Sequence, residues 1–218
     1  GFVKKSDENW MNKYFSCSEK VKIDLFLRYG SIAAAGDRHL AEFCPGDWYL
    51  KDKETVEKWG FALTPVSWRK GDLEKRLERS EKLYSGEEKF ELKETGEEGV
   101  QQIRALLGLG DLVTNVNIPN YGQIPNLPIG AVVETNACFR ANSLNPVFAG
   151  NIPQAIYPLI SRVCGEQEQV VDCALNRDLD GVFNAFAADP NMCISVSDTR
   201  KLFDEMVDNT KEYLKMYF

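Results

Sequence analysis

The stretch Tyr29-Gly-Ser-Ile-Ala-Ala-Ala-Gly-Asp-Arg-His-Leu-Ala-Glu-Phe-Cys-Pro45 is the part of the sequence from which the rest of the chain can be interpreted. Alanine and leucine favour a helix, which Pro45 ends. Asp37, Arg38 and His39 are consecutive, and on a helix Glu42 shares a face with the histidine. Together these side chains offer a base, a fixed cation, a neutral nitrogen ligand and a second acid. A functional site is one interpretation of this pattern.

A purely structural interpretation of the same stretch stays open. An amphipathic helix with solvated or paired charges has the same pattern, and clustered ionisable groups also occur where no chemistry takes place. The run 31–36, which consists almost entirely of small residues, allows a close approach to the backbone and does not decide between the two.

The composition excludes several classes of protein. The chain has 218 residues and a net charge of -7, which argues against a general nucleic-acid binder. No apolar run is long enough to span a bilayer, and no secretory signal is visible, so we expect no membrane partner and a cytoplasmic protein. The first residue is glycine. We therefore consider that the chain is a piece of something longer.

The cysteines predict buried free thiols rather than a metal site. None of the six is paired as C-x-x-C, and the chain has a single histidine, so no zinc-finger pattern is possible. The sequence also has no dinucleotide fingerprint, no P-loop and no G-x-S-x-G elbow.

Periodicity predicts a mostly helical α+β fold with a small antiparallel or mixed sheet. Two strands are expected over 111–118 and 130–139, with a turn-rich connection between them. Helices are expected at seven places: 8–28 with Ser18 as a cap, 52–59, 72–83, 100–107, 151–176 with Gly165 as a weak point, 178–188, and 197–217. Residues 48–98 are strongly charged and form a predicted helical excursion, which would suit an arm that reaches a partner subunit.

The connection between the two strands carries Asn117, Asn120 and Asn126. Amides both donate and accept hydrogen bonds, so these side chains suit sugar hydroxyls. Asparagines in turns also bind their own backbone, and this alternative stays open.

These segments resemble the C-terminal half of the NAD- and manganese-dependent glycosidases, glycoside hydrolase family 4, in its α-galacturonidase and α-galactosidase branch. The matching residues are Tyr29-Gly30, Gly36-Asp-Arg-His-Leu-Ala-Glu-Phe43 with Pro45, Asn117-Ile-Pro-Asn-Tyr-Gly-Gln-Ile-Pro-Asn-Leu-Pro128, Val133-Glu134, Asn145-Pro146, Ala174-Leu175, Asp189-Pro190 and Thr199-Arg-Lys-Leu-Phe-Asp-Glu-Met206. The resemblance covers most of the chain and is weakest in the charged middle.

The resemblance implies a fold, a reaction and cofactors. Residues 1–218 would be a single substrate and oligomerisation domain, similar to the C-terminal domain of lactate and malate dehydrogenases. Family members oxidise the sugar at C3 with NAD, eliminate the aglycone and add water, while Mn²⁺ stabilises the enolate. The Rossmann domain and the metal ligands lie in the N-terminal half, which is absent from this chain. We therefore expect no metal or cofactor to be bound here and no activity of the fragment alone.

The resemblance also implies roles for individual residues. Asp37 is the candidate base, and Tyr29 is the alternative. Arg38 would bind a uronate carboxylate, since guanidinium binds carboxylates bidentately. The remaining candidate substrate contacts are His39, Glu42, Asn117, Asn120 and Asn126.

The expected partners are an α-linked uronide or galactoside, the N-terminal Rossmann half, and further copies in a homodimer or homotetramer. α-Galacturonidase is the leading activity. Three alternatives are kept: an α-galactosidase or α-glucosidase of the same family, a non-catalytic sugar-binding or oligomerisation domain, and a relative of the dehydrogenase C-terminal fold.

Overall fold

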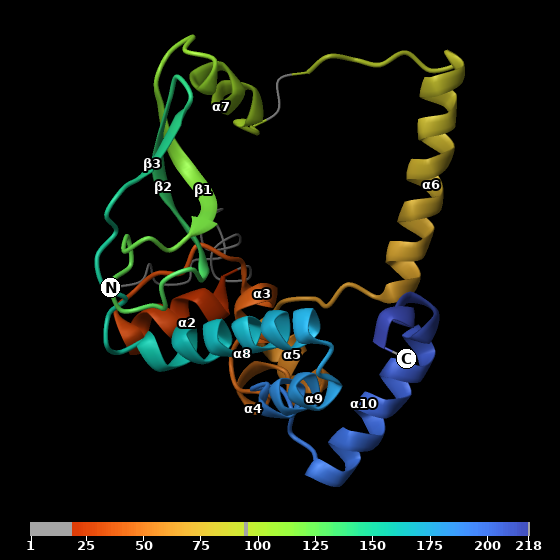
Figure 1. Ribbon diagram of the computed structural model, residues 1–218. Helices are drawn as coiled ribbons and strands as arrows, with labels where there is room; N and C mark the ends of the chain where they lie inside the picture. Colours follow the sequence, from red (N-terminus) through yellow and green to blue (C-terminus); the bar gives the residue numbers. More distant parts are fainter. Residues whose placement is uncertain (1–18, 94–95, 218) are drawn as a thin grey trace, which may run out of the picture. The chain divides into compact units, whose positions relative to one another are not determined.

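The computed structural model describes residues 19–93 and 96–217 (Figure 1). The chain forms two compact units. The first contains the described residues up to 61 together with 115–135 and 146–217, and the second contains 62–114 and 136–145.

From residue 19 to residue 61, the first unit contains four helices, α2 (Lys20–Tyr29), α3 (Asp37–Glu42), α4 (Gly46–Tyr49) and α5 (Lys53–Trp59). Their buried core consists of Val21, Leu25, Ala41, Cys44 and Tyr49. The predicted helix 8–28 can be compared only over its last part, because residues 8–18, including Ser18, lie outside the described residues. The predicted helix 52–59 is confirmed as α5, with Asp52 as its N-cap.

The segment 31–36 is not helical, so the helix predicted within residues 29–45 is confirmed only over Asp37–Glu42. Gly30 ends α2 with φ 71°, in the left-handed region that favours glycine. Gly36 precedes α3 in an extended conformation with φ -78° and ψ 165°. The small residues therefore form a connection between two helices instead of the start of one.

Three longer helices complete the first unit: α8 (Tyr157–Asn176), α9 (Leu179–Ala188) and α10 (Val196–Thr210). All three were predicted, with differences at the ends. α8 begins after Asn151 and Pro153 and continues through Gly165, while α10 stops at Thr210 and is followed by two short 3-10 turns. Phe203 of α10 packs against Phe183 and Phe186 of α9, with ring centroids 5.5 and 5.6 Å apart.

The small sheet has the order β1-β2-β3 and is antiparallel. β1 (Leu112–Pro119) and β2 (Val132–Arg140) confirm the two predicted strands. β3 (Ser143–Pro146) was not predicted. It follows β2 through Asn142, which has φ 54°, a left-handed value that asparagine tolerates better than most residues.

The second unit contains α6 (Val66–Ser85) and α7 (Gly99–Leu106) with the adjoining ends of the sheet. α7 buries Ala105, and its Leu106 carbonyl accepts from the Asn142 N–H at 2.9 Å. The Thr114 hydroxyl donates to the Glu98 carboxylate beside it. α6 extends the predicted helix 72–83 at both ends and buries no residue.

The predicted fold class is confirmed: the described chain is mostly helical with one small antiparallel sheet. Within the described residues, no helix is long and apolar enough to cross a membrane.

Candidate functional site

Asp37 is buried, with 5% of its surface exposed, and it connects α3 to the start of α2. Its two carboxylate oxygens accept from the backbone N–H groups of Val21 and Lys22, each at 3.0 Å. The first backbone N–H groups of a helix have no partner inside the helix. Glu19, at the N-cap of α2, makes no side-chain cap. Asp37 therefore caps α2 from a distant position in the sequence.

Arg38, His39 and Glu42 form a short polar chain on α3. His39 Nδ1 lies 3.3 Å from the Glu42 carboxylate, and His39 Nε2 lies 3.3 Å from Arg38 Nη2. Since a guanidinium only donates, Nε2 must accept from it and Nδ1 must carry the proton that goes to Glu42. The imidazole and carboxylate side chains are 55% and 45% exposed, so both remain accessible to a ligand.

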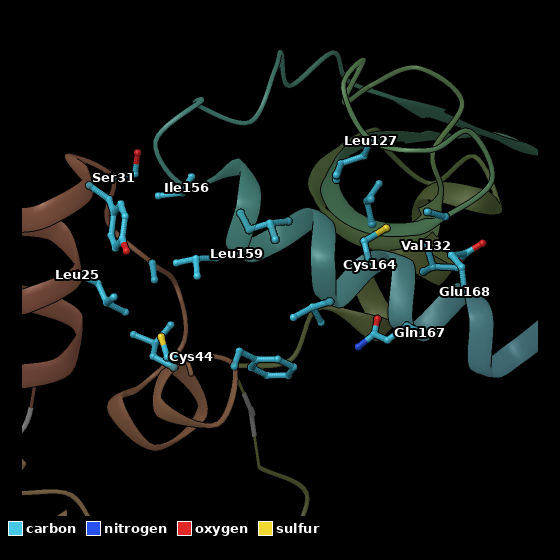
Figure 2. Close-up of a pocket in the computed structure, with 18 of the residues that line it drawn as sticks. Leu25, Ser31, Cys44, Leu127, Val132, Ile156, Leu159, Cys164, Gln167 and Glu168 are labelled. Carbon is cyan, nitrogen blue, oxygen red and sulfur yellow. The ribbon is translucent and has the colours of Figure 1, made fainter. Parts of the chain in front are cut away.

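Beside α3 lies a cavity of about 590 Å³ within the first unit (Figure 2). Most of its lining is apolar, and it draws on α2, the connection to α3, the start of β2 and one face of α8. In Figure 2, Leu159, Cys164 and Gln167 follow one another along α8, with Leu25 and Cys44 to one side and Leu127 and Val132 to the other. Its volume is in the range of small-molecule sites.

A hydrogen-bonded trio stands next to the cavity wall. The Tyr49 hydroxyl donates to Asp24 at 2.5 Å and accepts from Arg28 at 2.7 Å. Arg28 also stacks over the Trp48 ring, 4.4 Å from its centroid. Burial and the bond to Asp24 raise the pKa of the Tyr49 phenol well above its usual range. This trio fixes the C-terminal end of α2, whose last residue is Tyr29.

Cys44 is one of the cavity-lining thiols, and burial raises its pKa to about 11. Burial also raises the pKa of the Cys164 thiol. Both thiols are free, as predicted, and both are protonated near neutral pH, which makes them poor nucleophiles. The predicted burial of the thiols is confirmed for Cys44 and Cys173, but it is wrong for Cys193, which is exposed, and Cys138 and Cys164 are only half-buried.

Asn120 organises the loop between β1 and β2. Its side chain is fully buried, and its Nδ2 donates to the carbonyls of Ile124, Leu127 and Pro128 at 2.9 to 3.1 Å. Its Oδ1 accepts from the N–H groups of Gly122 and Ile124. A side chain so occupied holds the loop in one conformation.

Asn126 lies in the same loop, whereas Asn117, predicted in the connection, belongs to β1. Asn126 exchanges two hydrogen bonds with the backbone of Ile152, both at 2.9 Å, and so ties the loop to the segment that leads into α8. Asn117 is exposed on β1. Asn120 and Asn126 therefore bind backbone groups, as asparagines in turns often do. Contacts between a sugar and any of the three asparagines remain a prediction.

Of the predicted site residues, the structure brings only Tyr29 to the cavity. Asp37 lies beneath α2, and the polar chain of Arg38, His39 and Glu42 lies outside the cavity lining. Their catalytic and binding roles remain predictions.

Three polar cavity residues were missed by sequence reasoning: Ser31, Gln167 and Glu168. Gln167 and Glu168 belong to α8, whose sequence pattern indicates only an apolar stripe for a core or a subunit interface. No sequence pattern predicts that this helix lies beside residues 29–45.

The described residues do not form a metal centre, because no three histidine, cysteine, aspartate or glutamate side chains gather among them. Both ring nitrogens of the single histidine are hydrogen-bonded, one to Arg38 and the other to Glu42. The residues present therefore do not fit a Mn²⁺ site, and we assign no chemical step to a metal held by this part of the chain.

Residues 2–192 match the family model described as the family 4 glycosyl hydrolase C-terminal domain. The chain is 63% identical to an alpha-galacturonidase of Thermoanaerobacterium saccharolyticum and 50% identical to one of Thermoanaerobacter italicus. These matches cover 98% and 95% of the chain and 46% of each relative. An alpha-galactosidase of Rhizobium meliloti is 25% identical over 93% of the chain and 44% of the relative. The chain thus spans about half the length of the curated relatives it matches.

Two solved structures show the same fold. A Bacillus subtilis crystal structure, described provisionally as a glucosidase, matches with a TM-score of 0.80 and 46% identity over 93% of this chain and 46% of that one. A 6-phospho-alpha-glucosidase from gut microorganisms, solved with NAD and Mn²⁺, matches with a TM-score of 0.59 and 18% identity. This match covers 95% of this chain and 44% of that one.

Proposed function

We propose that the full-length protein is an α-galacturonidase. This chain belongs to the family 4 glycosyl hydrolases and matches their C-terminal domain. The observation that carries the proposal is the much higher identity to alpha-galacturonidases than to alpha-galactosidases, over nearly the whole chain. The substrate class is therefore an α-linked uronide.

Arg38 is the proposed contact for the uronate carboxylate. It is half-buried on α3, and its bond to His39 orients the guanidinium beside a side chain that is itself fixed by Glu42. A guanidinium held in this way matches the planar geometry of a carboxylate, which a neutral sugar lacks. The polar chain on α3 then distinguishes uronides from galactosides.

Tyr29 is the better supported of the two candidate bases. Its side chain lines the cavity, and the neighbouring Arg28 lies 5.6 Å from its ring centroid. Both oxygens of Asp37 already accept backbone hydrogen bonds, and the side chain is almost completely buried. A general base must reach the proton that it removes, either directly or through one water. This requirement favours Tyr29 for proton removal and Asp37 for positioning.

The cofactors are proposed for the full-length protein and not for the residues described here. NAD would supply reversible oxidation of the sugar and Mn²⁺ electrostatic stabilisation of negative charge. The solved relative that contains both supports this proposal through its shared fold. Their binding residues would come from the part of the relatives that this chain does not cover.

That remaining part is also the proposed cover of the cavity. Val171 lines the cavity and is 57% exposed, and α8 as a whole buries only Cys173. An apolar face this open is typical of a surface that another part of the protein covers. We therefore propose that the N-terminal portion packs here and closes the site.

Activity of the full-length protein tests the proposal. Hydrolysis of p-nitrophenyl α-galacturonide should require NAD, Mn²⁺ and a reductant, and should exceed hydrolysis of the matching galactoside. A preference for the galactoside would replace the substrate assignment. Sugar binding without cleavage of either compound would instead indicate a non-catalytic domain.

A further inference from the structure

Within the described residues of the second unit, the helix α6 exposes an apolar seam along its length. None of its 20 residues is buried, and Val66, Leu73, Leu77 and Tyr84 are 70%, 50%, 56% and 96% exposed. Helices of this length gain most of their stability from the packing of an apolar face. We therefore expect another surface to pack against this seam of α6 (Figure 1).

The spacing of the seam identifies the kind of surface that fits. Its members are separated by seven, four and seven residues, so they lie within about 40° of one another around the helix. This is the alternation of the a and d positions of a heptad. Val66 and Leu73 occupy d positions, and Leu77 and Tyr84 occupy a positions. Lys70 is the remaining a residue and Ser80 the remaining d residue.

The charges beside the seam identify the partner as a second copy in parallel orientation. Arg69 and Arg76 flank one side at g positions, and Glu74 and Glu81 flank the other at e positions. In a parallel pair each g residue meets the partner's e residue five positions further along. Arg69 would meet the partner's Glu74, and Arg76 the partner's Glu81. An antiparallel pair would bring each flank against itself, with like charges in contact.

These flanking charges have little to bind in their own chain. Within the described part of the chain, the side chains of Arg69, Glu74 and Glu81 make no hydrogen bond or ion pair. Arg76 pairs with Asp72 at 3.3 Å, but this guanidinium is 73% exposed, so exchange for a partner residue costs little. Lys70 at an a position is a polar residue of the kind that specifies register and oligomer state.

We propose that α6 is a self-association arm, which pairs in parallel with α6 of a second copy of this chain to form a short two-stranded coiled coil. The pairing is independent of the proposed hydrolase activity. It assigns the charged helix a function that neither the cavity nor α3 requires.

Charge exchange tests the orientation. In the full-length protein, Arg69→Glu with Arg76→Glu would place acids on both flanks, and we expect the dissociation constant of the pair to rise on the order of tenfold. Adding Glu74→Arg and Glu81→Arg to the same chain restores opposite charges only in a parallel pair. Light scattering over a concentration series should therefore show the oligomer mass halved in the double variant and recovered in the quadruple variant.

A crosslink tests the register directly. Ser80→Cys places a thiol at a d position, where the two copies face one another, and mild oxidation should give a covalent dimer. Ser85→Cys, at an outward b position, and the unaltered protein with its native cysteines are the matched controls. An unaltered protein that is monomeric at every concentration would overturn the proposal. So would a double variant that keeps its mass, or a crosslink no stronger at 80 than at 85. Circular dichroism confirms that each variant is folded.

Discussion

The Asp37 carboxylate accepts a hydrogen bond from the backbone N–H of Val21 at 3.0 Å, across 16 positions of sequence. A second bond, from the Lys22 N–H, involves the other oxygen. The acidic residue of the Asp-Arg-His segment is thereby part of the α2 N-terminus. The negative charge is also well placed against the helix dipole.

Asp37→Ala should destabilise the full-length protein by about 2 kcal/mol, because one buried and one partly buried N–H group lose a charged acceptor. Urea unfolding measures the change. Asp52→Ala, which removes the exposed N-cap of α5, is the matched control and should lower stability by less than Asp37→Ala. A loss no larger at position 37 than at position 52 would show that the bonds to α2 contribute little.

Asn120→Ala should be more costly than any other asparagine substitution in the loop. It would remove, from a fully buried position, the side chain that bonds three backbone carbonyls and two N–H groups, of which the Ile124 carbonyl alone keeps a second partner, for a loss of about 3 kcal/mol. Asn117→Ala, on an exposed residue, should change stability by less than about 0.5 kcal/mol. Thermal unfolding and hydrogen exchange across 119–131 would report both. Equal effects would contradict the organising role of Asn120.

The parts of the fold that the sequence predicts are those that local periodicity encodes. α9 and the two longer strands follow from apolar spacing alone. The segment 31–36 was predicted as helix because its alanines favour one, but Gly30, Gly36 and the bond between Asp37 and Val21 divide the stretch into a connection and a short helix. β3 is only four residues long, too short for a pattern, and it depends on the left-handed Asn142.

The candidate site was predictable only where one segment contains it. The contact between His39 and Glu42 follows from helical spacing, and the structure confirms that they are neighbours. The cavity is lined by residues 29–44 and by α8, which lies more than a hundred residues later in the sequence. No local sequence pattern predicts that Gln167 and Glu168 line it. Tertiary packing alone brings them together.

The Cys44 thiol should make stability depend on pH above 9. Its pKa rises from an ordinary 9.0 to about 11 on burial, so the folded state holds the proton more tightly than the unfolded state. The resulting stabilisation is complete below pH 9 and is lost as the pH rises through 11. Urea unfolding at pH 8 and pH 10.5 should show a decrease that Cys44→Ala reduces. At pH 8, about one thiol in a thousand is ionised, so iodoacetamide should label exposed Cys193 first.

Arg38→Ala should lower kcat/KM for a galacturonide by about 100-fold in the full-length enzyme, because a charged hydrogen-bonded contact to the carboxylate is lost. The galactoside lacks that carboxylate, so its kcat/KM should fall by less than about threefold. Arg38→Lys keeps the charge without the bidentate geometry and should give an intermediate loss. Equal losses on both substrates would remove Arg38 from the determinants of specificity.

Tyr29→Phe should reduce kcat of the full-length enzyme by about 100-fold or more while leaving stability nearly unchanged, because it removes a cavity-facing hydroxyl that we propose as the base. Tyr121→Phe is the matched control, since that ring is 69% exposed and outside the cavity lining, and its kcat should not change. Asp37→Asn separates the two candidates: as a positioning residue it should lower stability and kcat together, with an unaltered pH profile. If Asp37→Asn abolishes turnover at full stability while Tyr29→Phe remains active, Asp37 is the base and Tyr29 only shapes the cavity.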